Sequence, residues 1–157
     1  INRMSCIYGE FQKGVESQGW VDWFIRAKRN NLPIRIYGNG KQVRDVLFAT
    51  DVADLFIYQA EHMKACNGKT YNVGGGSRAG YHTSVLELID LIDALFPGKP
   101  LRYTWFPWRK SDQRYYVSDI RRVMADTGWH PSVELAKGLS IMWDAYHRRE
   151  KSHNKKT

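Results

Sequence analysis

Short apolar runs alternate along the chain with longer segments in which apolar side chains recur every three or four positions. The short runs predict β-strands, and the longer periodic segments predict helices. Strands are expected at residues 3–8, 34–37, 44–48, 70–73 and 101–105. Helices are expected at about residues 19–30, 50–63, 84–95, 119–127 and 134–148. Strands and helices in this alternating order are typical of an α/β fold.

Residues at several helix starts have the chemistry of N-terminal caps. Ser84 and Glu87 have capping-box spacing, so both side chains are expected to accept hydrogen bonds from backbone N–H groups of the first turn. Thr50 is expected to cap the helix at residues 50–63, and Ser118 or Asp119 is expected to cap the helix at residues 119–127.

A turn with two glycines, Gly38 and Gly40, separates the strands expected at 34–37 and 44–48 and predicts a β-hairpin. Gln42 and Arg44 would project from the returning strand. A guanidinium group is planar and always charged, so it offers a fork of N–H donors to a diphosphate. The same pattern also fits an ordinary hairpin with a surface arginine. Asp45 is interpreted as a structural partner that holds the hairpin.

A second basic segment favours the diphosphate interpretation. Arg109, Asp112, Arg114 and Asp119 follow the spacing Arg-x-x-Asp-x-Arg-x-x-x-x-Asp. Together with the glycine turn, this segment resembles the NAD-dependent nucleotide-sugar epimerase/dehydratase family. The resemblance implies that Arg44 and Arg109 hold the diphosphate of a nucleotide sugar between them.

Further segments extend the resemblance from Arg3 to about Tyr146. Residues 3–9 and 18–21 resemble the strand and loop that close over the sugar, residues 71–75 resemble a late strand, and residues 129–131 resemble the lead into the last helix. Within this family, the motif residues of the chain are most similar to those of CDP-tyvelose/CDP-paratose 2-epimerases. The resemblance implies the C-terminal portion of an extended short-chain dehydrogenase: late Rossmann strands plus a small α/β substrate-binding domain, as one portion over residues 1–147.

The resemblance also implies a set of substrate-binding residues. They are Tyr8, Gln18, Trp20, Gln42, Arg44, Asn72, Arg109, Asp112 and Arg114. Structural alternatives remain open for several of them: Tyr8 and Trp20 fit core or lid aromatics, Gln18 a contact to loop backbone, and Asn72 a turn residue. Asp112 fits a carboxylate that orients an arginine of its own segment.

Two motifs that such an enzyme requires are not found in this sequence. No G-x-x-G-x-x-G loop is present, and the glycines of residues 74–80 are spaced wrongly for one, so this segment is interpreted as a connecting loop. Tyr37 and Lys41 have Tyr-x-x-x-Lys spacing, but the glycines between them oppose a helix. We therefore expect no catalytic residue and no NAD site on this chain. NAD would be bound by the full-length family protein, whose dinucleotide-binding half is expected elsewhere or lost.

Composition and charge leave two other classes of function open. With 157 residues and 43% hydrophobic content, one core is expected. The net charge is +8, and residues 148–157 are expected to form a basic, disordered tail. A non-catalytic nucleotide-binding or assembly subunit remains possible on these grounds. A basic RNA-binding domain is a less favoured alternative, because the aromatic residues mostly occupy periodic core positions.

Cysteine, histidine and hydropathy patterns exclude other sites. Cys6 and Cys66 stand far apart without a C-x-x-C pair, and the histidines lack ligand spacing, so no metal site is expected. No apolar run approaches the roughly 18 residues of a membrane span, and no signal-peptide pattern is present, so a cytoplasmic protein is expected.

The strand expected at residues 3–8 also predicts that this chain associates with another chain. Strands 3–8 and 70–73 are expected to lie in one parallel sheet whose other strands belong to the N-terminal half. Side chains that would then face water include Met4, Ile7, Tyr71 and Val73. An unpaired hydrophobic edge recruits another strand, so a homo-oligomer, a swapped arrangement or a separate N-terminal partner chain is expected.

Overall fold

The structure is a computed structural model that describes residues 1–153, with side chains described through Arg149. Its elements, in chain order, are β1 (Asn2–Met4), β2 (Cys6–Tyr8), α1 (Trp20–Asn30), β3 (Ile34–Tyr37), β4 (Val43–Phe48), α2 (Ala49–Glu61), α3 (Met63–Cys66), β5 (Tyr71–Val73), β6 (His82–Ser84), α4 (Val85–Leu95), β7 (Tyr103–Phe106), β8 (Tyr115–Tyr116), α5 (Arg121–Thr127) and α6 (Leu135–His153).

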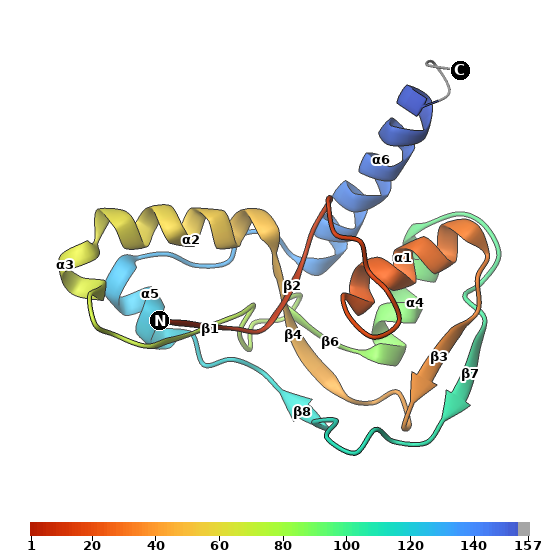
Figure 1. The fold of residues 1–157 in the computed structure, drawn as a ribbon, viewed down its shortest axis with the longest axis horizontal. Helices are drawn as coiled ribbons and strands as arrows, with labels where there is room; N and C mark the ends of the chain where they lie inside the picture. Colours follow the sequence, from red (N-terminus) through yellow and green to blue (C-terminus); the bar gives the residue numbers. More distant parts are fainter. Residues whose placement is uncertain (154–157) are drawn as a thin grey trace.

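The expected α/β class is confirmed. Figure 1 shows one side built from α2, α3, α5, β1 and β5, and another built from α1, α4, β3 and β7, with α6 projecting from the body. Parallel pairs join β1 to β5, β2 to β4, β3 to β7 and β4 to β8, and β4 pairs with β6 in antiparallel orientation. Strand β4 therefore has three neighbours and links the sheet elements on which the site is built.

The strand expected at residues 3–8 is interrupted at Ser5. Strand β1 before it pairs with β5, whereas β2 after it pairs with β4. The Ser5 backbone N–H donates to the Val73 carbonyl at 2.8 Å, and its hydroxyl donates to the Asp45 carbonyl at 3.1 Å. The chain thus passes from one sheet to another within a single residue.

The hairpin predicted around the glycine turn is wrong, although both of its strands exist. Strand β3 pairs with β7, and β4 pairs with β2, β6 and β8, so β3 and β4 are not partners. The turn is closed instead by Gln42, whose amide Nε2 donates to the Tyr37 carbonyl at 2.8 Å. The true partners come from distant parts of the chain, which local patterning does not reveal.

Helix starts agree with the expected caps in one case of three. At α4, the Ser84 hydroxyl accepts from the Glu87 N–H at 3.2 Å, and the Glu87 carboxylate accepts from the Ser84 N–H at 2.7 Å. This capping box is confirmed. Thr50 is not a cap, because α2 follows β4 directly after Phe48. Helix α5 begins after Ile120, so neither Ser118 nor Asp119 is its cap, although Asp119 accepts the backbone N–H of Arg121.

Buried side chains form two cores. The larger core joins β3 with α1, α4 and α6 through residues such as Ile25, Ile36, Ile92 and Leu139. The smaller core lies between β5, α2 and α5 and is centred on Trp129.

The prediction that Tyr71 and Val73 face water is wrong. Their side chains are only 2% and 0% exposed, because α2 and α5 cover them in the smaller core. Ile7 is partly buried against the same core, whereas Met4 is 39% exposed. The edge of β1 is therefore less apolar than expected.

Helix α6 extends further than the sequence predicted. It continues to His153, so residues 148–153 are helical rather than disordered. Arg148 Nη2 lies 2.9 Å from the Glu10 carboxylate, which ties this end of the helix to the body. Residues 154–157, the remainder of the expected tail, lie outside the described residues. Within residues 1–153, no helix has the length and apolar character that crossing a bilayer requires.

The capping box at α4 gives a stability prediction. Replacing Ser84 by alanine leaves the Glu87 N–H without its acceptor, so Ser84→Ala should lower the free energy of unfolding by about 1 kcal/mol. Urea denaturation measures this difference. Ser77→Ala, in an exposed loop, is the matched control and should stay within about 0.5 kcal/mol of the parent. Equal unfolding midpoints for all three proteins would contradict the cap.

Candidate functional site

One cavity collects six of the nine predicted substrate-binding residues. It has a volume of about 280 Å³ and lies between the loop before α1, the glycine turn and the segment after β7. We call it the arginine cavity. The six residues are Gln18, Trp20, Gln42, Arg44, Arg109 and Asp112.

Arg44 enters the cavity from β4 and is held by two hydrogen bonds. Its Nη2 donates to the Asp112 carboxylate at 2.7 Å, and its Nη1 donates to the Val43 carbonyl at 2.8 Å. The Arg44 and Asp112 side chains are 21% and 19% exposed. A guanidinium carries five N–H donors, so the observed bonds leave others free for a ligand. Asp112 thus orients Arg44, and not an arginine of its own segment.

Arg109 lines the cavity from the segment between β7 and β8. Its guanidinium lies 3.9 Å from the centroid of the Tyr37 ring, within the range of a cation–π interaction. Its Nη2 also approaches the Glu16 carbonyl at 3.5 Å. Arg109 is an exposed side chain on a segment without regular structure, so these contacts define its position.

Gln42 and Trp20 support the cavity wall. Gln42 is only 6% exposed, and its Oε1 has no hydrogen-bond partner among the described residues. The Trp20 indole N–H donates to the Cys6 sulfur at 3.1 Å. Burial raises the pKa of the Cys6 thiol to about 11, and the bond from Trp20 only partly opposes this rise. Cys6 is therefore a neutral thiol near pH 7, which does not suit a nucleophile.

The structure places the other three predicted residues away from the arginine cavity. Tyr8 is 1% exposed in the larger core, and its ring packs edge-to-face on Phe48. Its hydroxyl lies so close to α6 that a side chain at Gly138 would overlap it. Burial raises the pKa of Tyr8 far above its usual range.

Asn72 and Arg114 also lie elsewhere. Asn72 is exposed on β5 and lines a separate surface hollow with Arg3 and Arg122. The Arg114 guanidinium lies over the Trp108 ring at 4.3 Å. Its carbonyl accepts a hydrogen bond from the Val43 N–H at 3.0 Å, which joins this segment to β4.

Several cavity residues were not among the predicted site residues. Glu16, Trp23, Arg35 and Tyr37 all line the arginine cavity. The alternation of β3 carries a signal for two of them, because buried isoleucines alternate with Arg35 and Tyr37. Tyr37 was noted only for its Tyr-x-x-x-Lys spacing with Lys41.

Asp45 is a buried structural carboxylate, as the sequence indicated, but it does not hold the glycine turn. It is 0% exposed and accepts hydrogen bonds from the Ser5 hydroxyl, the Ser118 N–H at 3.1 Å and the Gly76 N–H at 3.3 Å. A side chain at Gly74 would overlap its Oδ2. The segment of residues 74–80, which we call the glycine loop, thus connects β5 to β6 and packs tightly on Asp45.

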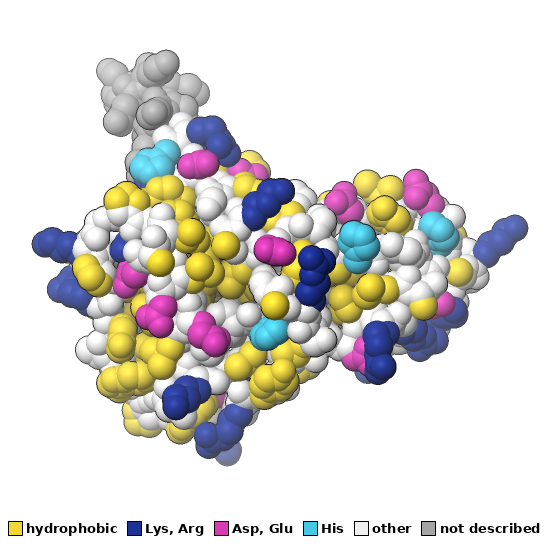
Figure 2. Space-filling model, turned by 180° about the vertical axis from the view of Figure 1, so that it is seen from behind, with side chains coloured by type: hydrophobic (Ala, Val, Ile, Leu, Met, Phe, Trp, Pro, Cys, Tyr) yellow, Lys and Arg dark blue, Asp and Glu magenta, His cyan; other side chains and the backbone are white. Residues whose placement is uncertain are grey.

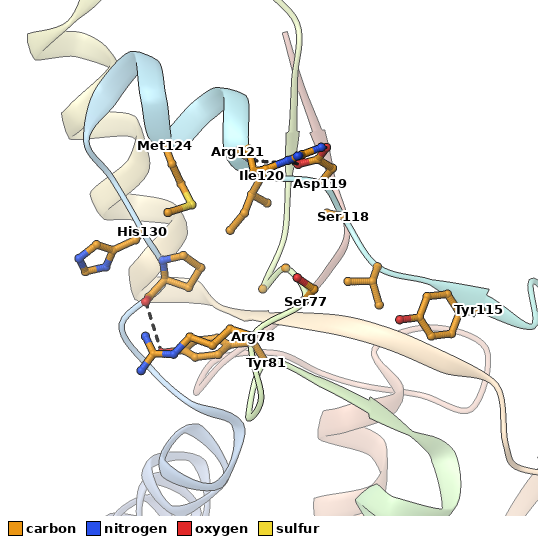
Figure 3. A pocket seen from close by; sticks show the side chains of 14 residues that line it. Ser77, Arg78, Tyr81, Tyr115, Ser118, Asp119, Ile120, Arg121, Met124 and His130 are labelled. Carbon is orange, nitrogen blue, oxygen red and sulfur yellow. Dashed lines mark hydrogen bonds and ion pairs between the residues drawn. The ribbon is translucent and has the colours of Figure 1, made fainter.

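A second cavity, of about 660 Å³ and thus larger than the arginine cavity, contains none of the nine predicted residues. Figure 3 shows Ile120 and Met124 from the α5 region above it, and Tyr81 and Arg78 below. Arg121 donates to the Asp119 carboxylate through Nε at 2.9 Å and Nη2 at 2.6 Å, and this pairing lowers the pKa of Asp119 to about 2. No group of three or more His, Cys, Asp or Glu side chains within the described part of the chain is placed to hold a metal ion.

Fold and site together define an α/β protein with a cavity suited to an anion. Comparisons with known proteins place it further. A family model described as "NAD dependent epimerase/dehydratase family" matches residues 1–74. The CDP-paratose 2-epimerase of Salmonella typhi is 37% identical over 149 residues, which are 92% of this chain and 43% of that protein.

Solved structures share the fold. Pal from Bacillus thuringiensis superposes with a TM-score of 0.80 at 26% identity, over 94% of this chain and 45% of that one. A UDP-glucose 4-epimerase with UDP-glucose from Thermotoga maritima has a TM-score of 0.77 at 24% identity, over 95% of this chain and 46% of that one. The chain belongs to the NAD-dependent epimerase/dehydratase family, and it spans less than half the length of these relatives.

The role of Asp45 as scaffold rather than ligand gives a second prediction. Asp45→Ala leaves the Ser118 and Gly76 N–H groups buried without an acceptor, which should lower the free energy of unfolding by about 2 kcal/mol or more. Asp54→Ala, at an exposed position of α2, is the control and should change it by less than about 0.5 kcal/mol. Thermal and urea unfolding measure both. A variant as stable as the parent would show that Asp45 does not hold these segments.

Proposed function

We propose that this chain binds a nucleoside-diphosphate sugar in the arginine cavity, as the substrate-binding part of a CDP-sugar 2-epimerase-like protein. The observation that supports this most directly is that Arg44 and Arg109, which are distant in the sequence, line one cavity. Two guanidinium groups from separate segments of the chain suit a diphosphate, since each offers charge-assisted hydrogen bonds. The relationship to a CDP-paratose 2-epimerase supports the choice of sugar nucleotide.

Aromatic side chains complete the chemistry of this pocket. Trp20, Trp23, Phe24 and Tyr37 line it beside the arginines. Ligand pockets combine apolar walls with a few polar groups that fix orientation. We propose that the rings of Trp20, Trp23 and Phe24 contact the base or the sugar, while the arginines hold the phosphates.

The glycine-rich segment of residues 74–80 does not fit the pyrophosphate of the dinucleotide cofactor that the family name implies. A pyrophosphate loop needs open glycine backbone at a helix N-terminus. Here the backbone of residues 74–76 is buried, and Asp45 fills the space in front of Gly74. We therefore assign this chain no step of hydride transfer and propose that NAD is bound by another part of the whole protein.

The clamp is tested by removing each arginine. Arg44→Ala and Arg109→Ala should each weaken CDP or UDP binding by about 1.5 to 3 kcal/mol, or roughly ten- to a hundredfold, because each removes a charge-assisted contact. Isothermal titration calorimetry measures the affinities. Arg102→Ala is the matched control, because Arg102 donates to the Asn31 carbonyl outside the cavity. Parent-like binding by both cavity variants would refute the clamp.

The same titration separates the alternative of RNA binding. Figure 2 shows Lys and Arg side chains scattered among hydrophobic and acidic ones over the face it displays, rather than gathered in a stripe. Phosphate-tracking binding weakens steeply with salt, whereas binding in a partly enclosed pocket is less sensitive. Repeating the titrations with a short single-stranded RNA at two salt concentrations distinguishes the two classes. A non-catalytic nucleotide-binding subunit would bind CDP or UDP as well as the substrate-binding part of an enzyme would.

We also propose that a further strand and helix pack against β1 and α2, from a second copy or a partner chain. Strand β1 has β5 as its one neighbour among the described strands. Beside the buried side of α2, exposed apolar side chains continue along the helix and into α3, with Phe56 at 49%, Ile57 at 56% and Met63 at 57% exposure. An open edge next to an exposed apolar helix surface favours association.

Light scattering tests this assembly. At micromolar concentration we expect a species larger than the 18.3 kDa chain. Ile57→Glu should shift the population toward the monomer, because it places a charge in the apolar contact. Leu95→Glu, at a 39% exposed position on α4, is the control and should leave the assembly unchanged. A monodisperse 18.3 kDa parent whose β1 and β5 amides are strongly protected from hydrogen exchange would overturn the proposal, because it would show that the edge is covered from within the chain.

A further inference from the structure

Tyr37 lines the arginine cavity and is held at both ends of its side chain. It lies at the end of β3, whose isoleucines anchor the strand in the larger core. The ring packs against Phe106 of β7 with centroids 5.6 Å apart, and the two residues are register partners. At the other end, the Tyr37 hydroxyl donates to the Glu16 carboxylate at 2.8 Å. Ring and hydroxyl are thus both fixed.

The fixed ring provides a surface for Arg109. The guanidinium lies 3.9 Å from the ring centroid, the shortest of the cation–π distances in the described part of the chain. Arg109 lies between β7 and β8, on a segment without helix or strand. A long side chain on such a segment loses rotamer freedom when a ligand orders it. Contact with Tyr37 reduces that loss, since it restricts the guanidinium before binding.

Glu16 completes this arrangement. Besides accepting from Tyr37, its carboxylate lies 3.6 Å from Arg35, and its backbone carbonyl faces Arg109. A carboxylate that accepts from a phenol strengthens the negative face of the ring, which attracts the cation above it. Arg44, which lines the same cavity, has Asp112 as its own partner. The two arginines are therefore held by different residues: Arg44 by Asp112, and Arg109 by Tyr37 and Glu16.

We infer that Tyr37 and Glu16 are positioning residues that hold the Arg109 guanidinium in place for the ligand diphosphate; this inference rests on the proposed function. Tyr37 acts through Arg109 and not by proton transfer, because its hydroxyl is already donated to Glu16. Lys41, its partner in Tyr-x-x-x-Lys spacing, lies beyond the glycine turn and is exposed.

Calorimetric titration of the chain with CDP and UDP tests the inference in a double-mutant cycle. Tyr37→Leu should weaken binding about two- to fivefold, the size of a cation–π contact near the surface. In the Arg109→Ala background the same change should have no further effect. In the Arg44→Ala background the two- to fivefold loss should persist. A loss that persists without Arg109 would show that Tyr37 acts on the ligand or the fold, and would overturn the inference.

Two milder variants keep the test decisive if Tyr37→Leu does not fold. Tyr37→Phe keeps the ring but loses the bond to Glu16, so it should weaken binding less than Tyr37→Leu does, and Glu16→Gln should weaken binding only while Arg109 is present. Tyr103→Leu, which changes an exposed aromatic of β7 outside the cavity, is the control and should bind as the parent does. If Arg109→Ala itself binds normally, the proposed function fails. If Arg109→Ala loses affinity and no Tyr37 or Glu16 variant does, only the positioning inference fails.

Discussion

The Asp45 carboxylate fixes how the three parts of the chain that surround it meet. It accepts hydrogen bonds from the chain crossing at Ser5, from the glycine loop at Gly76 and from the segment before α5 at Ser118. Successive side chains of a strand point to opposite faces. With Asp45 directed into this junction, its neighbour Arg44 is directed to the other face, where the cavity lies. The buried Asp45 carboxylate thereby determines the orientation of the partly buried Arg44 side chain.

The positive charges of the arginine cavity are nearly balanced by negative charges. The arginines that line it (Arg35, Arg44 and Arg109) exceed the carboxylates (Glu16 and Asp112) by one positive charge. Pairing of this kind keeps long cationic side chains in defined positions and limits their mutual repulsion. A diphosphate entering the cavity would meet donors that are already oriented, although the neighbouring carboxylates reduce the net attraction. Shape and hydrogen-bond geometry therefore contribute to selection along with total charge.

Local sequence signals predicted the elements of this fold better than their partners. Ser84 and Glu87 were predictable because a capping box involves only neighbouring residues. The pairing of β3 with β7 was not, since register between distant strands is decided by tertiary packing. Strands β6 and β8 are too short to give an apolar run. The family resemblance predicted that Arg44 and Arg109 meet at one site, and both line the arginine cavity. Tyr8, in contrast, is buried in the larger core, because helix α6 packs on it.

The segment that carries Arg109 is anchored at both ends to the strands on either side of the glycine turn. It leaves β7, which is bonded to β3, and enters β8, which is bonded to β4. The turn and the segment therefore form two spans between the same pair of supports. A residue inserted into residues 38–42 would advance β4 by about 3.3 Å and turn Arg44 to the opposite face, while the other span kept its length. The two spans are therefore matched in length, and a change in the length of one requires a compensating change in the other.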